Sequence, residues 1–413
     1  MDKQFYTNIE SELSQDILPF WEKYARNTAQ ENFYTAIQPD TTGACSDTST
    51  VDMVCGYLFA YSAAARLYRK TKYLDFADYA YKYLFHVFFD TLNGGMYHAI
   101  NKDDDPLDDT KTLFAQSCAL YAIAEYAAAL KEVRKLDYPA TVVFDKSLAL
   151  YTMIERFARD KQNGGYTEIL SANWTTPAQE NGGSQKKNFT SHLMLLESYT
   201  NLLRTISIVY PEQKDTRSLI SKSLEQLTAL FTDKMLSKEN HFCASYTADW
   251  LPLDAKTICF GRNIESSRAL WEAANELSNS ELCAKMRTVS IAIARTALVE
   301  GFDHTTGGFE HGQTETAHDT TRLWKDQAEA LIGFYNAWEL TGGEDFKNAF
   351  LKEWEWISAR QKDAVNGEWF YAVAKDGTVD MTKEKGSNEK TAFYTARACI
   401  TLLQKSGMTP GAV

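Results

Sequence analysis

The stretch Asp90-Thr91-Leu92-Asn93-Gly94-Gly95-Met96-Tyr97 decides the fold, because it recurs along the chain. Two clear copies are Lys161-Gln162-Asn163-Gly164-Gly165-Tyr166 and Asp303-His304-Thr305-Thr306-Gly307-Gly308-Phe309. Three weaker copies are Gln30-Glu31-Asn32-Phe33-Tyr34, Glu239-Asn240-His241-Phe242 and Asn366-Gly367-Glu368-Trp369-Phe370. Six copies spaced by about 60 to about 76 residues indicate a repeat architecture.

The segments between the copies predict helices. Residues 111–131 place apolar or small side chains at spacings of three and four, which is the period of one helix face. The same pattern occurs in residues 191–204, 265–277, 324–340 and 390–403. A repeat unit of about 67 residues holds two such helices and their connections, at about 1.5 Å of rise per residue.

The Gly-Gly-aromatic blocks predict turns followed by short strands. Gly94 and Gly95 permit the positive φ that a tight turn needs. Residues 96–100 then alternate like a strand, and residues 103–106 turn it back. Residues 369–377 repeat this pattern. We expect short hairpins gathered at one end of the molecule.

A closed ring of helix pairs suits the length of the chain. Its 413 residues exceed the ~250–300 at which one compact core stops growing. In a ring each pair packs only on its neighbours, and the small side chains of residues 60–65 and 122–129 allow close helix approach. The sequence therefore predicts an all-α (α/α)6 barrel, with residues 1–413 as a single domain and a loose tail after about residue 405.

Composition and charge limit the partners. The formal net charge is −12 and no long basic run occurs, so we expect no nucleic-acid partner. Aromatic residues make up 13% of the chain, with 9 Trp, and aromatic faces stack on sugar rings. Filling a ring of helices accounts for most of them without any ligand.

The targeting signals point to the cytoplasm. The N-terminus lacks a basic segment followed by an apolar one, so no signal peptide is expected. No run of about 18 apolar residues occurs, so no membrane partner is expected. Seven cysteines, an odd number, lie mostly in predicted helices and indicate reduced thiols. A monomer and a homodimer both stay open.

Common cofactor and metal motifs are absent. The chain has no GxGxxG, P-loop, HExxH or paired CxxC sequence, and we expect no cofactor and no metal. His304, His311 and His318 recur every seven residues, but they lie across a Gly-rich turn and not on one helix face. We interpret them as solvated loop histidines.

Four predicted helices carry a resemblance to the N-acylglucosamine 2-epimerase superfamily, and within it to the cellobiose 2-epimerases. Residues 319–331 are similar to its D-T-x-R-x-W-W-x-Q-A-E stretch, and residues 192–202 to its H-L-x-x-L-E-A-Y-T-N-L helix. Residues 260–267 resemble F-G-H-D-I-E-A-S, and residues 394–399 resemble Y-H-N-G-R-A-C. The similarity covers nearly the whole chain, and the family's (α/α)6 barrel agrees with the repeat count.

The resemblance implies sugar chemistry at C2. Family members epimerise sugars there or interconvert aldoses and ketoses. One histidine removes the C2 proton of the ring-opened sugar, and a second returns it to the opposite face. Imidazole suits this work because its pKa lies near the operating pH.

Both of these histidines are replaced when this chain is set against the family motifs. The first becomes Arg262, which stays protonated, and the second meets Tyr394, a phenol with a reference pKa of ≈ 10. The family's substrate-side arginine falls near Gly56. Two family tryptophans become Lys325 and Arg268.

Carboxylates persist in the same motifs. Glu265 and Glu329 keep family positions, and Glu368 keeps its place before Trp369. Around them stand the cations Arg262, Arg268, Arg322, Lys325 and Arg397. Two interpretations stay open: the cations pair with carboxylates inside the ring, or they bind an acidic sugar such as a uronate, sulfo- or phospho-sugar.

Several single residues have two interpretations each. His192 is a candidate catalytic histidine or a satisfied core histidine, and the family often has a second histidine where Met194 stands. Tyr394 is a candidate general acid if a neighbouring cation lowers its pKa. Trp324 and Trp369 are candidate platforms for a sugar ring, or core residues.

Three functions therefore remain. The first is a carbohydrate epimerase or isomerase in which His192, Tyr394 or a carboxylate moves the proton. The second is an inverting glycoside hydrolase or lyase, with Glu265 and Glu329 as the carboxylate pair and Glu368 or Asp319 as substitutes. The third is a non-catalytic barrel that binds an acidic sugar or a partner protein.

Overall fold

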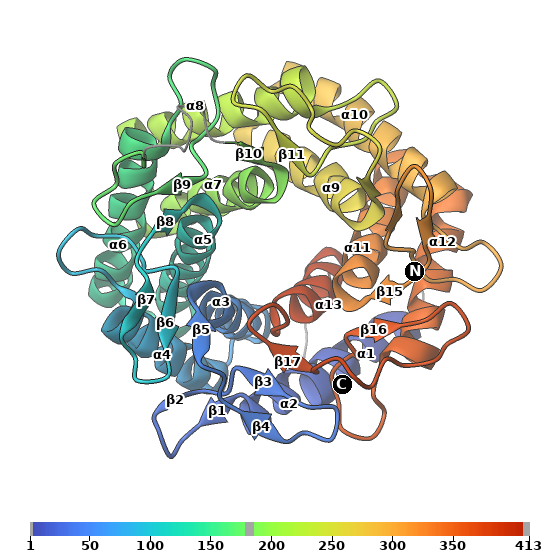
Figure 1. Cartoon of the computed structure of the whole chain (residues 1–413), viewed down its shortest axis with the longest axis horizontal. Helices are drawn as coiled ribbons and strands as arrows, with labels where there is room; N and C mark the ends of the chain where they lie inside the picture. Colours follow the sequence, from blue (N-terminus) through green and yellow to red (C-terminus); the bar gives the residue numbers. More distant parts are fainter. Residues whose placement is uncertain (1–2, 178–185, 408–413) are drawn as a thin grey trace.

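Two concentric rings of helices form the molecule (Figure 1). In this computed structural model the described residues are 3–177 and 186–407. Each inner helix packs on the next, and the last packs on the first, so the inner ring closes. The inner helices are α3 (Val51–Tyr68), α5 (Leu113–Ala129), α7 (Phe189–Val209), α9 (Phe260–Leu277), α11 (Trp324–Thr341) and α13 (Phe393–Lys405). The predicted (α/α)6 barrel is confirmed.

The outer ring alternates with the inner one along the chain. Most outer helices end in a π-helical turn that leads toward the next repeat block. The outer elements are α1 (Lys3–Ser11) with η1 (Glu12–Ile17) and α2 (Leu18–Tyr24); α4 (Leu74–Tyr83) with η3 (Leu84–Phe88); α6 (Asp137–Met153) with η5 (Ile154–Ala158); α8 (Lys214–Leu230) with η7 (Phe231–Met235); α10 (Ser280–Glu300); and α12 (Glu344–Trp356) with η8 (Ile357–Gln361).

Short antiparallel strands cover the face on which the inner helices begin (Figure 1). They are shorter than the predicted strands. A strand that leads into each inner helix pairs with the strand that follows the next outer helix, and the last pairing returns to the first repeat. These pairs are β5 (Thr48–Thr50) with β6 (Ala99–Asn101), β8 (Lys111–Thr112) with β9 (Ile169–Leu170), β10 (Lys187–Asn188) with β11 (Ser245–Tyr246), β12 (Ile258–Cys259) with β13 (Gly312–Gln313), β15 (Arg322–Leu323) with β16 (Ala372–Val373), and β17 (Gly386–Ser387) with β3 (Ala36–Ile37).

Additional strands extend this face. β1 (Arg26–Asn27) pairs with β2 (Asn32–Phe33), and β4 (Gly43–Ala44) pairs with β3. β7 (Pro106–Asp108) joins β6, and β14 (His318–Asp319) joins β13. The predicted gathering of hairpins at one end is therefore what the structure shows.

The repeated block is a turn that fastens each inner helix to the preceding outer one. Each of the six copies contains a residue of positive φ, which is Gly95 in the clearest copy. Asp90 accepts the backbone N–H groups of Leu92 and Asn93, each at 2.9 Å, and it pairs with the buried Lys111 at 2.8 Å. Because Lys111 lies directly before α5, the ion pair fixes where that helix begins.

Three other copies repeat this ion pair. The equivalent pairs are Asp160–Lys187 (2.7 Å), Asp303–Arg322 (3.1 Å) and Asp363–Lys385 (2.6 Å). A basic residue in or next to the strand that leads into an inner helix is thus part of the repeat, so Arg322 belongs to the scaffold.

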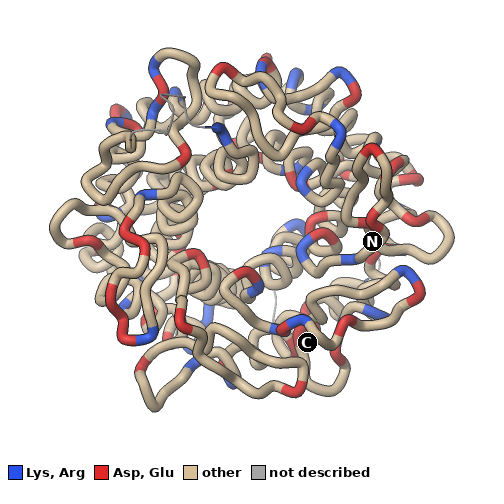
Figure 2. Tube along the Cα trace, viewed as in Figure 1, with Lys and Arg blue, Asp and Glu red and all other residues tan. Residues whose placement is uncertain are grey.

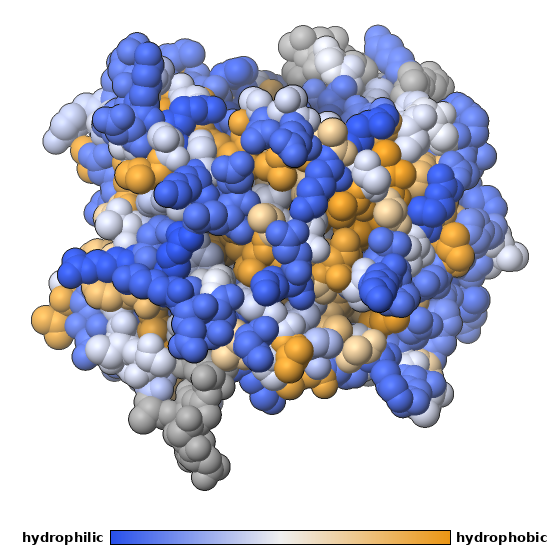
Figure 3. Space-filling view, turned by 90° about the horizontal axis from the view of Figure 1, so that it is seen from above, coloured by the Kyte–Doolittle hydropathy of each residue, from blue (hydrophilic) through white to orange (hydrophobic). Residues whose placement is uncertain are grey.

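The inner helix α5 shows how closely the ring is packed. Its Ala-rich sequence is apolar on every side and almost wholly buried. Together with η4 (Leu130–Arg134) it is the one described element long and apolar enough to cross a bilayer, but 89% of that window is buried inside the barrel. The outer wall, by contrast, carries mainly hydrophilic residues between apolar patches (Figure 3).

The predicted helix positions are confirmed, with ends that differ by a few residues. α7 and α9 begin before the predicted residues, and α13 begins three residues later, because the loop after β17 continues to Ala392. The predicted tail after about residue 405 lies mostly outside the described residues.

Candidate active site

Two adjoining hollows lie at the first turns of the inner helices. One, of about 460 Å³, is lined mainly by α3, α5 and α13, and the other, of about 420 Å³, mainly by α9 and α11. Tyr394 of α13 lines both.

The second hollow, which we call the charged pocket, joins the residues that the family motifs single out. Arg262, Glu265, Lys325, Glu329 and Tyr394 all line it. Helices α9 and α11 are neighbours in the ring, and their first turns point to the same face. In Figure 2 charged positions of both signs gather where α9, α11 and α13 meet.

Two arginines form a buried ion network beside this pocket. Arg397 pairs with Glu197 at 2.8 Å, Glu265 at 2.8 Å and Glu329 at 2.5 Å. Arg268 pairs with Glu197 at 2.6 Å, Glu329 at 3.1 Å and Glu272 at 3.2 Å. These two predicted substrate-binding cations are therefore occupied by carboxylates, as the first interpretation of the cluster expects.

The network leaves Glu265 in a neutral form. Burial, with the adjacent charges of Glu329 and Glu197, raises the pKa of Glu265 despite its bond to Arg397. A carboxylic acid that is protonated near neutral pH and lines a pocket can donate a proton. Glu265 thus keeps its candidacy as an acid.

Tyr394 is not prepared as an acid. Burial and the charge of Glu265 raise its pKa well above the ordinary value, with Glu329 and Glu197 adding to the shift. The prediction that Arg262 or Lys325 lowers this pKa is wrong: Arg397 opposes the shift, but burial and the carboxylates outweigh it. Its hydroxyl makes no hydrogen bond within residues 3–177 and 186–407.

Lys325 and Arg262 differ from the buried arginines. Lys325 forms a half-exposed pair with Glu389 at 3.0 Å, and Glu389 also accepts a hydrogen bond from Tyr371 at 2.6 Å. Burial opposes the charge of Lys325, but Asp326 and Glu389 outweigh it and raise its pKa. The partly buried Arg262 guanidinium has no ion-pair or hydrogen-bond partner in the described part of the chain.

The sequence analysis missed His311, which also lines the charged pocket. It precedes β13, and its Nδ1 lies 2.7 Å from Oδ2 of Asp326 in the first turn of α11. The hydrogen bond to Asp326, together with the charge of that carboxylate, raises the pKa of His311, although burial opposes protonation. The prediction of a solvated loop histidine is wrong for His311, whereas His318 pairs with Glu310 and His304 contacts the Leu298 carbonyl.

Cys259 lies next to this pair. One ligand-type atom from each of Cys259, His311 and Asp326 falls within a 4.8 Å cluster. Burial and the charge of Asp326 raise the pKa of the Cys259 thiol to about 11, so it is neutral near pH 7. A neutral thiol and the neighbouring ammonium of Lys325 do not favour a cation there.

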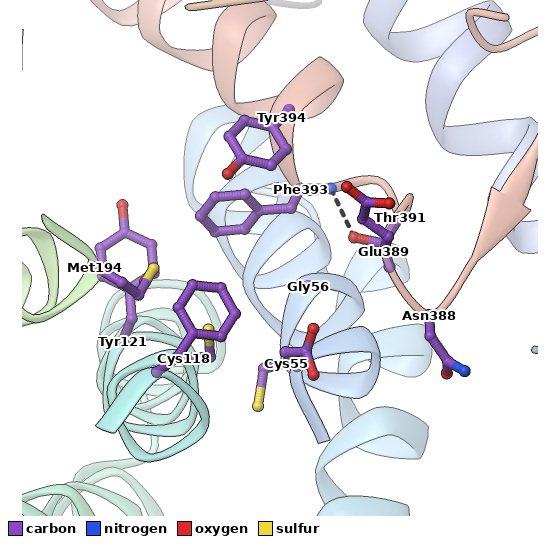
Figure 4. Close-up of a pocket in the computed structure, with 12 residues that line it drawn as sticks. Cys55, Gly56, Cys118, Tyr121, Met194, Asn388, Glu389, Thr391, Phe393 and Tyr394 are labelled. Atoms are coloured by element: carbon purple, nitrogen blue, oxygen red, sulfur yellow. Dashed lines mark hydrogen bonds between the residues drawn. The ribbon is translucent and has the colours of Figure 1, made fainter. Parts of the chain in front are cut away.

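The first hollow is more apolar, and we call it the aromatic hollow. Phe393 and Tyr394 face Tyr121, Cys118 and Met194 across it (Figure 4). Gly56 lies in its wall, where an added Cβ would be 2.3 Å from the Thr391 hydroxyl oxygen. The position at which the family resemblance expects an arginine therefore has no room for a side chain.

His192 is a structural residue. It is fully buried, its Nδ1 bonds the Asn188 carbonyl at 2.8 Å, and its Nε2 accepts the N–H of Tyr166 at 3.1 Å. Burial lowers its pKa to about 4. The catalytic assignment of His192 is wrong, and the core interpretation holds.

Four other predicted site residues are also buried away from both hollows. Arg322 pairs with Asp303 as described above, and Trp324 packs on Tyr371 with ring centroids 4.3 Å apart. The other two hold the outer wall to the ring: Glu368 accepts Lys390 at 3.0 Å and Trp21 at 2.7 Å, and Trp369 donates to Glu12 at 2.8 Å. All four side chains are buried, so none of them presents a surface to a substrate.

The fold and the charged pocket together define a class: an (α/α)6 barrel with proton-transfer groups and cations at the first turns of its inner helices. The profile of the N-acylglucosamine 2-epimerase (GlcNAc 2-epimerase) family matches residues 32–399. The chain belongs to this family, as a divergent member of the carbohydrate epimerases and isomerases.

Relatives agree over the full length. Cellobiose 2-epimerase of Bacteroides fragilis is 31% identical over 411 residues, covering 98% of this chain and 100% of the relative. The structure of cellobiose 2-epimerase from Bacillus thermoamylovorans is similar with a TM-score of 0.87 at 26% identity, covering 98% of this chain and 100% of that one. A D-mannose isomerase shares the fold, with a TM-score of 0.80 at 17% identity and 98% coverage of both chains.

Proposed function

We propose that this protein is a sugar isomerase that moves a proton at C2 of an open-chain sugar held in the charged pocket. The observation that carries the proposal is the convergence of Arg262, Glu265, Lys325 and His311 on one small hollow. Moving a C2 proton needs a base, an acid and a cation near the carbonyl oxygen, and this hollow contains each kind of group.

We infer further that the substrate carries a negative charge. Arg262 is the support, because a partly buried guanidinium that has no partner among residues 3–177 and 186–407 is suited to a carboxylate or phosphate. Lys325 adds a second cation at the same wall, and the positive ends of α9 and α11 point to the same face. The aromatic hollow would take the apolar face of a second sugar unit.

The hydrolase alternative receives less support. Oε1 of Glu265 and Oε1 of Glu329 both bond to the same nitrogen, Nη2 of Arg397, at 2.8 and 2.5 Å. Two oxygens so placed are closer than the ~6.5–9.5 Å that an inverting pair needs for its water. Both also have an arginine partner, which opposes the role of a free general base.

The cellular setting is part of the proposal. We infer a cytoplasmic enzyme, and the support is that all seven cysteines are free thiols. A monomer and a homodimer are both compatible with the ring. No metal or cofactor is required by the proton transfer.

The test is solvent exchange. The protein is incubated in D₂O with neutral sugars (D-mannose and cellobiose) and acidic ones (a hexuronate and a hexose phosphate), and C2 deuterium is followed by NMR. We expect deuterium at C2 of an acidic sugar and a raised melting temperature with the same compound. Thermal shifts with no exchange by any sugar would favour the non-catalytic binder, and shifts with neutral sugars alone would refute the acidic substrate.

The Arg262→Gln variant tests whether the substrate is negatively charged. This variant removes the unpaired cation and no described ion pair. We expect KM for the acidic sugar to rise by ~10-fold or more, with little change for a neutral one. Arg204→Gln, on the far half of α7, is the matched control.

A further inference from the structure

His311 is held by Asp326 in a way that leaves one imidazole nitrogen for the pocket. Nδ1 lies 2.7 Å from Oδ2 of Asp326, so Nδ1 carries the donated hydrogen and Nε2 is the basic atom. Nε2 has no partner among the described residues, and the side chain is 33% exposed. The residue lines the charged pocket with Glu265 and Lys325.

Asp326 is in turn fixed by its surroundings. Its side chain is 3% exposed and sits in the first turn of α11, against the start of α9. A Cβ at Gly261 would lie 2.0 Å from Oδ1 of Asp326, so the carboxylate reaches His311 through space that only glycine leaves open. The Phe260 N–H also donates to the His311 carbonyl at 3.0 Å, which fixes the backbone of the histidine.

We infer that His311 is the general base of the proposed reaction and that Asp326 is its positioning residue. The inference rests on the proposed function and assigns the proton-transfer role within it. Neither residue falls on a histidine position of the family motifs, so this chain would use an imidazole beside the β13–β14 hairpin in place of one from an inner helix.

The step balances without any further reactant. Nε2 of His311 takes the C2 proton, the C–H electrons form the C1=C2 double bond, and the carbonyl oxygen becomes the enediolate oxygen, whose charge Lys325 or Arg262 stabilises. For the ketose, the C2 hydroxyl proton passes to the C1 oxygen, and His311 returns its proton to C1 as the C2 carbonyl forms. Return to C2 from the neutral carboxyl of Glu265 gives the epimer, and the resulting Glu265 carboxylate regains its proton as the histidinium releases one through solvent.

The titratable groups around His311 come from four elements, α11, α9, β12 and β14. Asp326 and Lys325 approach from α11, Arg262, Glu265 and the Cys259 thiol from α9 and the residue before it, and Asp319 from β14. The acids outweigh Lys325 at the imidazole. Losing Asp326 should therefore lower the pH at which the imidazole becomes a free base.

The experiment follows C2 exchange in D₂O across pH 5–9 in the full chain, with the sugar panel described above. We expect His311→Gln to lower the rate by ~10²-fold or more. We expect Asp326→Asn to lower it less and to move the acid limb of the pH–rate profile to lower pH, which a merely structural role would not do. His318→Gln, in the same hairpin but outside the pocket, is the matched control and should keep the wild-type rate.

The outcomes separate the two ideas. Exchange by wild type that persists in a folded His311→Gln overturns the base assignment and leaves the isomerase proposal intact. No exchange by wild type with any sugar overturns both. Loss of exchange on treatment with a chelator, restored by Zn²⁺, would replace the base with a metal site on Cys259, His311 and Asp326.

Discussion

Nη1 of Arg397 lies 2.8 Å from Oε2 of Glu197, although the two residues are 200 positions apart in the sequence. They come from α13 and α7, which face each other across the inner ring (Figure 1). The ion pair therefore spans the interior of the barrel and joins two helices on opposite sides of the ring. Arg397 also pairs with Glu265, so the same arginine links Glu197 to a residue of the charged pocket.

Removing Arg397 should destabilise the whole barrel. Arg397→Met leaves three buried carboxyl groups, those of Glu197, Glu265 and Glu329, without their shared cation, and breaking a buried pair costs ~3–5 kcal/mol. Lys405→Met, which breaks the more exposed pair with Glu339, should cost ~0–1 kcal/mol. Urea unfolding at pH 7 measures both, and equal losses for the two variants would contradict the role of the network.

The stability of the Glu265→Gln variant relative to wild type should increase as pH rises. Burial beside Glu329 and Glu197 raises the pKa of Glu265 in the folded state, so wild type loses stability as pH rises from the ordinary glutamate value toward the folded one. Glutamine keeps the neutral form at every pH. The melting temperature of the variant relative to wild type should thus increase from pH 6 to pH 9.

The control for this variant is Glu239→Gln at an exposed position. Its melting temperature relative to wild type should stay constant over the same interval. A constant difference for Glu265→Gln as well would show that the carboxyl is already ionised at pH 6.

The repeat turns should set the acid limit of stability. Burial opposes the charge of Asp90, but Lys111 and the turn N–H groups outweigh it and lower its pKa to about 2. Ionised Asp90 therefore adds ~2 kcal/mol to the free energy of unfolding. This contribution is complete above the ordinary aspartate pKa of ≈ 3.9 and is lost as pH falls toward 2. Asp90→Asn should lose about this much at pH 7 and much less at pH 2.5.

Asp47→Asn, at an exposed position, should change neither value. Guanidinium unfolding at the two pH values decides the matter. An Asp90→Asn loss that is the same at pH 2.5 and pH 7 would mean that the carboxylate charge is not what holds the turn.

Gly56 and Thr391 should be coupled. An alanine methyl at residue 56 would lie 2.3 Å from the Thr391 hydroxyl oxygen, and overpacking of this kind costs ~1–3 kcal/mol. Thr391→Ala removes that oxygen, so the double variant should recover most of the loss of Gly56→Ala. A double-mutant cycle by thermal unfolding measures the coupling, and additive losses would refute it.

The fold could be predicted because it depends on features that repeat. The left-handed turn residue and the helical spacing recur in each unit, so errors at a single copy did not matter. Which motif side chains face the pocket could not be predicted in the same way. Successive helix positions differ by about 100°, so Lys325 reaches the pocket whereas Trp324, one residue earlier, packs against Tyr371.

His311 could not be found from the sequence because its partner is fixed only by tertiary structure. Asp326 is 15 residues away, in the first turn of α11, which follows β13, β14 and β15 in the chain. A weak signal existed, since Asp326 places an acid inside the Trp-x-x-Gln-Ala-Glu motif at the first turn of an inner helix. Tertiary structure also decides the role of Arg322. From the sequence it was predicted to bind substrate, but it pairs with Asp303 and completes a repeat turn.

Ring closure has a consequence for synthesis of the chain. β17 pairs with β3, and α13 packs on α3, so the first and last repeats complete each other. Until α13 has been synthesised, the faces of α3 and α11 that pack on it expose apolar surface. Nascent chains should therefore depend on chaperones until the final helix emerges, and truncated chains that end before it should aggregate.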